Sequence, residues 1–370
     1  MSHLTTLSLR LGAYSRQLIE DHQNTFFLCV FTHLKYLTQL QKLEFTIVGN
    51  FLLKDIHTEH LALFLQDLKN LETLELNLPH LESLSEVVIS LAKGLRDLSG
   101  LKHLKIKCKT NKNASISYKA MEIFSNSLAH LQLKSLDLTF FDEQLSNPTL
   151  APFQTQGSFA PLSYSISGFR DLSSLNLDLS VFNLSTQELK DFTLVLNSLH
   201  KLSSVSLVIP QLNSANDFED LSSFLSCFKM MPNLNSLHLT FTGKNLCDQE
   251  VDVIARNLNG CRHLQRLQLF FPHAEKLSES CLDFLQPGFA NLTKLERLKI
   301  KIGNEWEFGF DIVCKFLTGL ISLKRLKELS FEGREIPSPL YTHYPMLESL
   351  QKLYHLKHLT KIVVNGYRYI

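Results

Sequence analysis

The chain has 370 residues, of which 44% are hydrophobic and 20% are charged, and its formal net charge is +1. This composition excludes intrinsic disorder for most of the chain, because enough apolar side chains are present to build a core. The balanced charge gives no reason to expect nucleic acid or a membrane surface as a partner. Glycine and proline number only 14 and 11, which favours regular elements with few long loops.

The opening residues MSHLTTLSLRLGAYSR lack the charged, apolar and small-residue regions of a secretion signal. The longest apolar run near them, 26–31, is too short to cross a bilayer. The seven cysteines are odd in number and widely spaced, which favours free thiols in a reducing compartment. The sequence therefore predicts an intracellular, cytoplasmic protein without a membrane span.

An apolar pattern of the form Leu-x-x-Leu-x-Leu-x-Leu recurs from end to end at intervals of 30 to 39 residues. Its first position, called n here, is occupied in turn by Leu4, Leu40, Leu71, Leu101, Leu133, Leu172, Leu202, Leu234, Leu264, Leu295, Leu326 and Leu359. Positions n, n+3, n+5 and n+7 are apolar almost throughout, whereas n+2, n+4 and n+6 are polar with three exceptions. Such alternation predicts a strand with one face in a core and one face in water.

Between these strands, apolar residues recur at helical spacing. The segments concerned are 61–68, 87–95, 189–199, 221–228 and 251–258. Two of them follow capping-box signals, Ser83 with Glu86 and Ser185 with Glu188, in which hydroxyl and carboxylate satisfy backbone donors of the first turn. Each repeat is therefore predicted to be a strand, a turn, a helix and a second turn.

One such repeat cannot bury its apolar face alone, but stacked neighbours can. Each buried Leu or Phe stabilises the fold by about 1.5–3 kcal/mol relative to an exposed one. About eight such residues per repeat, from the strand and the helix together, form a continuous core when the repeats stack. The expected fold is an α/β solenoid (horseshoe) of about 12 strand–helix repeats over residues 1–370. A parallel sheet would line its concave face, and the wider helices would cover its convex face.

The chain resembles the leucine-rich repeat family, in particular its long-repeat, ribonuclease-inhibitor-like class. Blocks such as LETLELNL (71–78), LSSLNLDL (172–179) and LNSLHLTF (234–241) carry the resemblance. The segment 247–269 is also similar to the cysteine-containing repeats of ubiquitin-ligase substrate receptors. The family usually places asparagine just after the strand, where it bonds the backbone along the stack, but this chain has no such asparagine ladder.

The fifth repeat is interrupted by a proline-containing loop insertion at about 141–168. Three prolines, among them Pro161, break the helical pattern there, so this repeat is expected to lose most of its helix. The loop could fold over the convex side without a further role. Alternatively, exposed aromatic side chains of this loop could help to hold a partner; these are Phe153, Phe159 and Tyr164.

No motif for a nucleotide-binding loop, a dinucleotide fold or a nucleophile elbow occurs, so the chain is not expected to be an enzyme or to bind a cofactor. The pairs His57–His60 and His355–His358 lack a third ligand at zinc spacing and are interpreted as surface histidines, not as a metal site. Core packing is the preferred interpretation for the cysteines in apolar slots, which are Cys29, Cys108, Cys227 and Cys314.

The candidate binding surface is the wall formed by positions n+2, n+4 and n+6. Its predicted partner-binding residues are His103, Lys105, Lys107, His238, Arg266, Phe270, Arg297, Lys299 and Lys301. Phe270 is the most suggestive, because aromatic side chains and arginines dominate binding energy at interfaces. It could equally pack against side chains of a neighbouring strand. Between these residues the wall is small and neutral or acidic, with Asp137 and Asp178 among its members.

A second basic feature is the segment 96–119, which contains seven lysines and arginines but only one acidic residue, an aspartate. It could meet an acidic protein or a phosphate-bearing ligand, but most simply it is a solvated surface. An array without polar caps at its ends also leaves open strand edges, so self-association end to end, or capping by a partner, is a further hypothesis. Sedimentation as a monomer at high concentration would count against it.

The sequence favours a non-catalytic interaction scaffold or adaptor that binds another protein on its concave face. A regulator of a partner enzyme, such as an inhibitor or activator of a small GTPase or nuclease, is the alternative that the resemblance implies. The wall is not strongly acidic like that of the inhibitors, and the chain ends in NGYRYI instead of an acidic tail. A ligase receptor is disfavoured, because a strand at Leu4 leaves no room for a preceding F-box, and nucleic-acid binding is disfavoured by the balanced charge.

Overall fold

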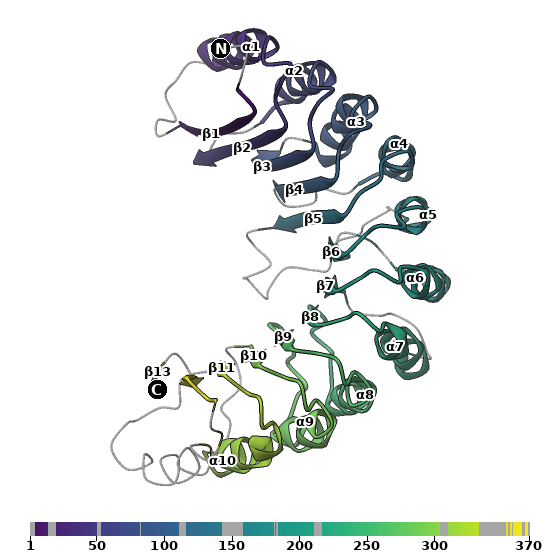
Figure 1. The fold of residues 1–370 in the computed structure, drawn as a ribbon, viewed down its shortest axis with the longest axis vertical. Helices are drawn as coiled ribbons and strands as arrows, with labels where there is room; N and C mark the ends of the chain where they lie inside the picture. Colours follow the sequence, from purple (N-terminus) through teal and green to yellow (C-terminus); the bar gives the residue numbers. More distant parts are fainter. Residues whose placement is uncertain are drawn as a thin grey trace. The chain divides into compact units, whose positions relative to one another are not determined.

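The computed structural model describes residues 4–13, 20–49, 53–81, 83–110, 116–142, 158–180, 182, 184–210, 217–303, 310–332, 353, 356, 358–364 and 367–368. The chain forms two compact units, unit 1 (Met1–Leu184) and unit 2 (Ser185–Ile370). Both are built by alternation of strand and helix (Figure 1).

Unit 1 contains the strands β1 (Thr6–Ala13), β2 (Lys42–Gly49), β3 (Thr73–Leu81), β4 (His103–Thr110), β5 (Ser135–Asp142) and β6 (Ser174–Asp178). Its helices are α1 (Glu20–Leu34), α2 (Asp55–Gln66), α3 (Leu84–Leu95), α4 (Tyr118–Leu128) and α5 (Ala160–Ser167). The six strands pair in chain order, and every pair is parallel.

Unit 2 contains the strands β7 (Ser204–Ile209), β8 (Ser236–Phe241), β9 (Arg266–Phe271), β10 (Arg297–Ile302), β11 (Glu328–Glu332), β12 (Lys361–Val364) and β13 (Tyr367–Arg368). Its helices are α6 (Thr186–Ser198), α7 (Asp217–Ser226), α8 (Asp248–Leu258), α9 (Ser280–Phe289) and α10 (Phe310–Gly319). Strands β7 to β12 pair in chain order and in parallel, and β13 folds back antiparallel to β12.

The predicted repeat architecture is confirmed. Each strand from β1 to β12 begins two residues after one of the twelve leucines that define position n. In each unit the helices cover one face of the sheet and leave the other uncovered (Figure 1). The molecule is therefore an α/β repeat protein, consistent with a leucine-rich repeat solenoid. That the two units form one continuous solenoid stays a prediction.

Burial along the strands follows the predicted alternation. In β7 and β8 every second residue is buried and the residues between them are half-buried. Position n+3 illustrates the buried set, since Val205, Leu237 and Leu267 are each 1% exposed or less. Their side chains pack against the helices, while the alternate side chains stay on the uncovered face.

Successive repeats are joined by a backbone ladder at position n+1. The carbonyl of Thr5 accepts hydrogen bonds from the N–H groups of both Gln41 and Lys42, at 2.8 and 2.9 Å. The carbonyl of Gln41 in turn accepts from Glu72 and Thr73. The same doubly accepting carbonyl recurs at Glu72, Lys102, Lys134, Ser203, Asn235, Gln265, Glu296 and Lys327. Because backbone groups make this link, the stack does not depend on the asparagine ladder that the sequence lacks.

The helix starts follow the capping signals. The hydroxyl of Ser83 accepts a hydrogen bond from the N–H of Glu86 at 3.3 Å. Ser185 and Glu188 form the reciprocal pair: the serine hydroxyl accepts from Glu188 N–H, and the carboxylate accepts from Ser185 N–H at 3.0 Å. These bonds satisfy donors of the first turn, which have no partner within the helix.

The prediction for 141–168 is partly wrong. β5 continues to Asp142, and α5 occupies Ala160–Ser167, with Pro161 in its first turn. Proline is tolerated there because the first N–H groups of a helix have no intrahelical acceptor. Phe159 is fully buried and packs against Phe182 with ring centroids 5.3 Å apart, so it is not an exposed gripping residue. Tyr164 is 80% exposed, and Phe153 lies outside the described residues.

Helices α8 and α9 approach closely at Gly288. A Cβ atom added there would lie 2.7 Å from both the carbonyl oxygen and the Cβ of Ala255. We expect Gly288→Ala to destabilise unit 2 by about 1–3 kcal/mol, because the helices must separate. Alanine's better helix propensity, worth at most about 1 kcal/mol, does not offset this cost. Urea unfolding followed by circular dichroism measures the change.

Gly260→Ala is the matched control for this prediction. There the added Cβ would meet only the side chain of Lys229, at 2.6 Å, and that flexible side chain can move away. We expect the control to change stability by less than about 0.5 kcal/mol. Equal unfolding midpoints for the two variants would contradict the close approach of α8 and α9.

Candidate interaction surface on the open face

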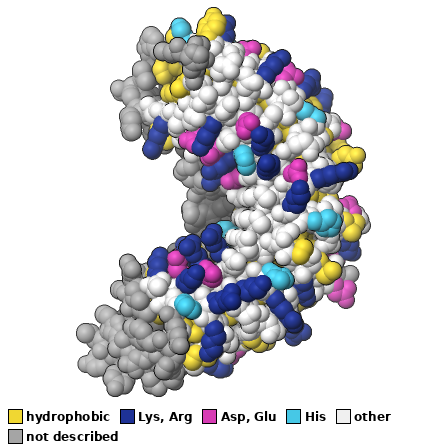
Figure 2. Space-filling model, viewed as in Figure 1, with side chains coloured by type: hydrophobic (Ala, Val, Ile, Leu, Met, Phe, Trp, Pro, Cys, Tyr) yellow, Lys and Arg dark blue, Asp and Glu magenta, His cyan; other side chains and the backbone are white. Residues whose placement is uncertain are grey.

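The uncovered face of the sheet in each unit, called the open face here, is formed by positions n+2, n+4 and n+6. Figure 2 shows charged side chains on the sheet side of the molecule as well as over the helices. Glu75, Lys105 and Lys299 retain 34%, 41% and 37% side-chain exposure. These three residues therefore lie on the surface, as the alternation predicts, and not in the core.

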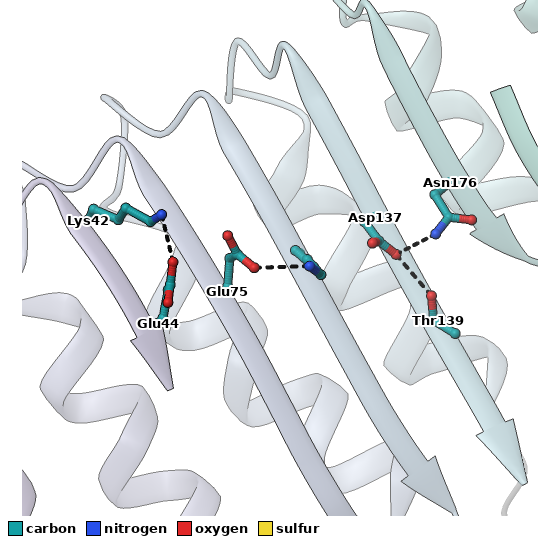
Figure 3. Close-up of polar contacts among 7 residues, drawn as sticks. Lys42, Glu44, Glu75, Asp137, Thr139 and Asn176 are labelled. Carbon is teal, nitrogen blue, oxygen red and sulfur yellow. Dashed lines mark hydrogen bonds and ion pairs between the residues drawn. The ribbon is translucent and has the colours of Figure 1, made fainter. Parts of the chain in front are cut away.

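In unit 1 several charges of the open face form ion pairs with one another, whereas Arg10 and Lys107 form none with the residues that the structure describes. Lys42 pairs with Glu44 at 2.6 Å on β2, and Lys105 of β4 pairs with Glu75 of β3 at 3.0 Å. Figure 3 shows Lys42, Glu44 and Glu75 on neighbouring strands. Hydrogen bonds from Lys42 and Ser8 hold the pKa of Glu44 below its usual value. Register places the carboxylate of Glu75 directly beside Lys105, so the pairing follows from the parallel alignment of the repeats.

A second polar cluster continues this row toward β6. Asp137 accepts hydrogen bonds from Thr139 and from Asn176, each at 2.9 Å (Figure 3). Asp137 is also the register neighbour of Lys105. The open face of unit 1 is thus an internally bonded polar surface with little charge left over.

The cations of the basic feature at 96–119 that the structure describes lie on different elements. Lys105 and Lys107 lie on the open face of β4, whereas Lys119 is on α4 and Arg96 caps the end of α3. Lys102 pairs with Glu72 of the preceding repeat at 2.7 Å. His103, the first residue of β4, is exposed and lies on the same face as Lys105 and Lys107. The spatial arrangement therefore supports the interpretation of a solvated surface.

Asp178 departs from the prediction that it belongs to the exposed wall. It is 4% exposed, and both the backbone N–H and the hydroxyl of Ser180 donate hydrogen bonds to its carboxylate. Burial raises the pKa of Asp178 to about 6, and the bonds from Ser180 act in the opposite direction. β6 ends at this residue, and the following turn provides its partners, which the n+6 rule did not take into account.

In unit 2 the parallel register aligns the predicted residues of β9 and β10 in three rows. Arg266 lies beside Arg297, Gln268 beside Lys299, and Phe270 beside Lys301. Both arginines and Lys301 are exposed, and Lys299 and Phe270 are partly exposed. The sequence therefore identified a set of residues that the structure brings together on one surface.

Phe270 packs between two neighbours on this surface. The His238 ring meets it edge-on with centroids 4.6 Å apart, and the ammonium group of Lys299 lies 5.4 Å from its ring centroid. The packing that was one of the two sequence interpretations is therefore present. Because the ring is only half-buried, part of its apolar surface stays open beside Lys301.

His238 is held in place by hydroxyl groups of β7 and β8. Ser206 Oγ lies 3.2 Å from its Nδ1 and Thr240 Oγ1 lies 3.3 Å from its Nε2. Burial, followed by the nearby charge of Lys299, lowers the pKa of His238. The imidazole is therefore neutral at pH 7. It packs against Phe270 as an uncharged ring.

Two acidic residues of β11 complete the surface and were not among the predicted site residues. Glu328 lies 3.5 Å from Arg297, and Glu332 pairs with Lys299 at 2.8 Å and with Lys301 at 3.6 Å. Partial burial acts to raise the pKa of Glu332. The hydrogen bond and charge of Lys299, together with the charge of Lys301, act in the opposite direction, and the pKa of Glu332 is lowered. Applying the n+2 and n+6 rule to the segment beginning at Leu326 would have found both residues.

The histidine and cysteine interpretations need two corrections. His57 is buried rather than on the surface, and its Nδ1 accepts a hydrogen bond from Lys54 N–H at 3.1 Å. Cys29 is exposed, because it lies on an outward face of α1, whereas Cys108, Cys227 and Cys314 are buried as expected. Among the described residues, no group of three or more histidine, cysteine or acidic side chains is arranged to hold a metal ion.

The geometry defines a protein of repeated strand–helix units whose open face carries the candidate residues. No protein-family model matches this chain, and no curated protein matches it. In the described part of the chain, no helix combines the length and apolar character needed to cross a membrane.

Proposed function

We propose that this chain is a leucine-rich repeat protein of the long-repeat, ribonuclease-inhibitor-like class, and that it acts as a non-catalytic scaffold that binds another protein on its open face. The repeat period, the parallel strands in chain order and the helices on one side of the sheet support the class. Repeat proteins of this kind present extended surfaces built from many strands.

The functional proposal rests mainly on the rows of aligned side chains on the open face of unit 2, which the helices that the structure describes leave uncovered. Arginine, lysine and aromatic side chains from adjacent strands lie together there, partly exposed and aligned by register. These residue types supply much of the binding energy at protein interfaces. A rigid sheet holds them in position, so a partner would gain contacts without first ordering a flexible segment.

Charge reversal on the open face tests the proposal. One variant is Lys299→Glu with Lys301→Glu in unit 2, and another is Lys105→Glu with Lys107→Glu in unit 1. The immobilised native chain is expected to retain a partner protein from a lysate of its source cells, and at least one of these variants is expected to lose it. Retained proteins are measured by quantitative mass spectrometry.

The matched control is Lys93→Glu with Lys119→Glu, which makes the same change in charge on exposed residues of α3 and α4. It is expected to retain the partner, and circular dichroism checks that every variant is folded. Retention by both open-face variants, or loss by the control to the same extent, would place the binding surface elsewhere. Failure of the native chain to retain any protein would contradict the scaffold function itself.

A further inference from the structure

The open face of unit 2 carries a larger excess of positive charge than the open face of unit 1. On β9 to β12 its cations are Arg266, Arg297, Lys299, Lys301 and Lys361. Its carboxylates are only Glu328 and Glu332, and Glu332 is shared by two lysines. Arg266 is exposed and forms no ion pair with any residue that the structure describes. Partial compensation of this kind leaves a surface that attracts anionic groups.

The charge excess is combined with one apolar site. The ring of Phe270 is fixed from the sides by His238 and Lys299, and part of it stays uncovered. A ligand that carried only charged groups would leave the uncovered part of this ring in water. A ligand that also carries an apolar side chain could bury it, and burial of aromatic surface is a main source of binding energy.

The spacing of the three rows determines how far apart the side chains of a ligand must be to contact all of them. Along a strand, positions n+2, n+4 and n+6 follow one another at about 6.6 Å, and adjacent strands lie about 4.8 Å apart. On β9 and β10 these positions present first the two arginines, then Lys299, then Phe270. An extended chain alongside the strands turns alternate side chains to one face at the same interval. Its facing residues would be acidic, acidic and apolar.

We propose that the open face over β9 and β10 binds an extended acidic segment of a partner protein, with two acidic residues and one apolar residue at alternate positions. This inference rests on the proposed scaffold function and names the chemistry of its partner. The pattern is Glu-x-Glu-x-Leu or its reverse, according to the direction of the segment. Carboxylates meet Arg266, Arg297 and Lys299, and the apolar side chain covers Phe270.

The two carboxylates of the surface favour a peptide over a nucleic acid. Glu328 lies beside Arg297, and Glu332 lies between Lys299 and Lys301. A phosphate backbone carries a charge on every nucleotide and would bring some of them against these glutamates. A peptide with spaced carboxylates can avoid them, because the positions between its acidic residues are neutral.

The test measures fluorescence anisotropy with a labelled peptide, Gly-Ser-Glu-Thr-Glu-Thr-Leu-Ser-Gly, and the full chain. A second peptide of equal composition, Gly-Ser-Glu-Glu-Thr-Leu-Thr-Ser-Gly, breaks the alternate spacing. A third peptide, Gly-Ser-Leu-Thr-Glu-Thr-Glu-Ser-Gly, presents the reverse order. The first or the third peptide is expected to bind at least about fivefold more tightly than the second, and more weakly as salt is raised. If neither binds more tightly than the second peptide, the proposal is overturned.

Variants of the chain locate the site. Arg266→Glu with Arg297→Glu, and separately Phe270→Ala, are each expected to weaken binding by about tenfold or more. Glu332→Gln is expected to strengthen binding, because it releases Lys299 and Lys301 together. The control Lys93→Glu with Lys119→Glu is expected to leave binding within about twofold of the native chain. Unchanged binding by the Arg266 and Arg297 variant overturns the assignment, whatever the other variants do.

Two outcomes separate this inference from the function on which it rests. A 12-nucleotide oligouridine that displaces the bound peptide and binds more tightly would overturn the peptide assignment in favour of nucleic acid. If partner capture is lost by the Lys105 and Lys107 variant but is unchanged by the Arg266 and Arg297 variant, the scaffold function stands and this inference fails.

Discussion

Leu65→Ala is expected to lower the free energy of unfolding of unit 1 by about 3–5 kcal/mol. Leu65 lies in α2 and is 0% exposed, and its Cβ would be only 3.2 Å from a Cβ added at Gly94 of α3. The truncation leaves a cavity between neighbouring helices and the sheet, and the packed repeats on both sides limit its collapse. Urea unfolding followed by circular dichroism measures the loss.

The same helix supplies the control. Leu63 lies two residues earlier and is 61% exposed, so Leu63→Ala removes the same atoms from water instead of from the core. Its effect is expected to stay within about 0.5 kcal/mol, because alanine is also the better helix former. A similar cost for the two substitutions would show that α2 does not turn Leu65 toward the sheet.

Acid is expected to destabilise unit 1 through His57, by up to about 3 kcal/mol. Burial, then the charges of His60 and Lys54, lower the pKa of His57 to about 4. The folded pKa thus lies below the unfolded value near 6.5, so this stabilisation is complete above pH 6.5. It is lost as the pH falls from about 6.5 to about 4, because a proton on Nδ1 removes the acceptor that holds Lys54 N–H.

His57→Gln separates this effect from other acid-sensitive groups. Glutamine at this helix position can accept the same backbone hydrogen bond but does not titrate. The unfolding free energy of the native chain, measured relative to this variant, should therefore fall between pH 6.5 and 4. His60→Gln, at a partly exposed position on the same helix, removes one of the charges that lower the pKa of His57, so the loss of stability should keep its direction but be complete at a slightly higher pH. A constant difference across this pH range would rule out the buried neutral histidine.

Periodicity was sufficient to predict where the strands lie. The twelve leucines mark their starts because a repeated strand needs apolar residues at fixed offsets, whatever the side chains around them. Asp178 and Pro161 show where the rule fails. The first is buried by a turn just after its strand, and the second sits in a helix turn that tolerates proline. Both outcomes depend on local backbone geometry that alternation does not encode.

The basic and aromatic residues of the candidate surface in unit 2 were predicted, but its two acidic residues and its side-chain contacts were not. Alternation identified Phe270, Arg297 and Lys299 as neighbours on one face. It did not show that His238 and Lys299 pack against the ring of Phe270, or that Glu332 forms ion pairs with two lysines. These contacts depend on side-chain rotamers across strands some 30 residues apart in the chain. Register decides them, and a single sequence gives register only through the repeat period.

The backbone ladder at position n+1 has a consequence for how such a protein can change its length. Since backbone carbonyl and amide groups join successive repeats at this position, a duplicated repeat brings its own means of attachment. Its surface residues are then free to diverge, provided that proline stays out of the two donor positions. Recognition of new partners could thus evolve by copying and editing single modules while the seam between them stays the same.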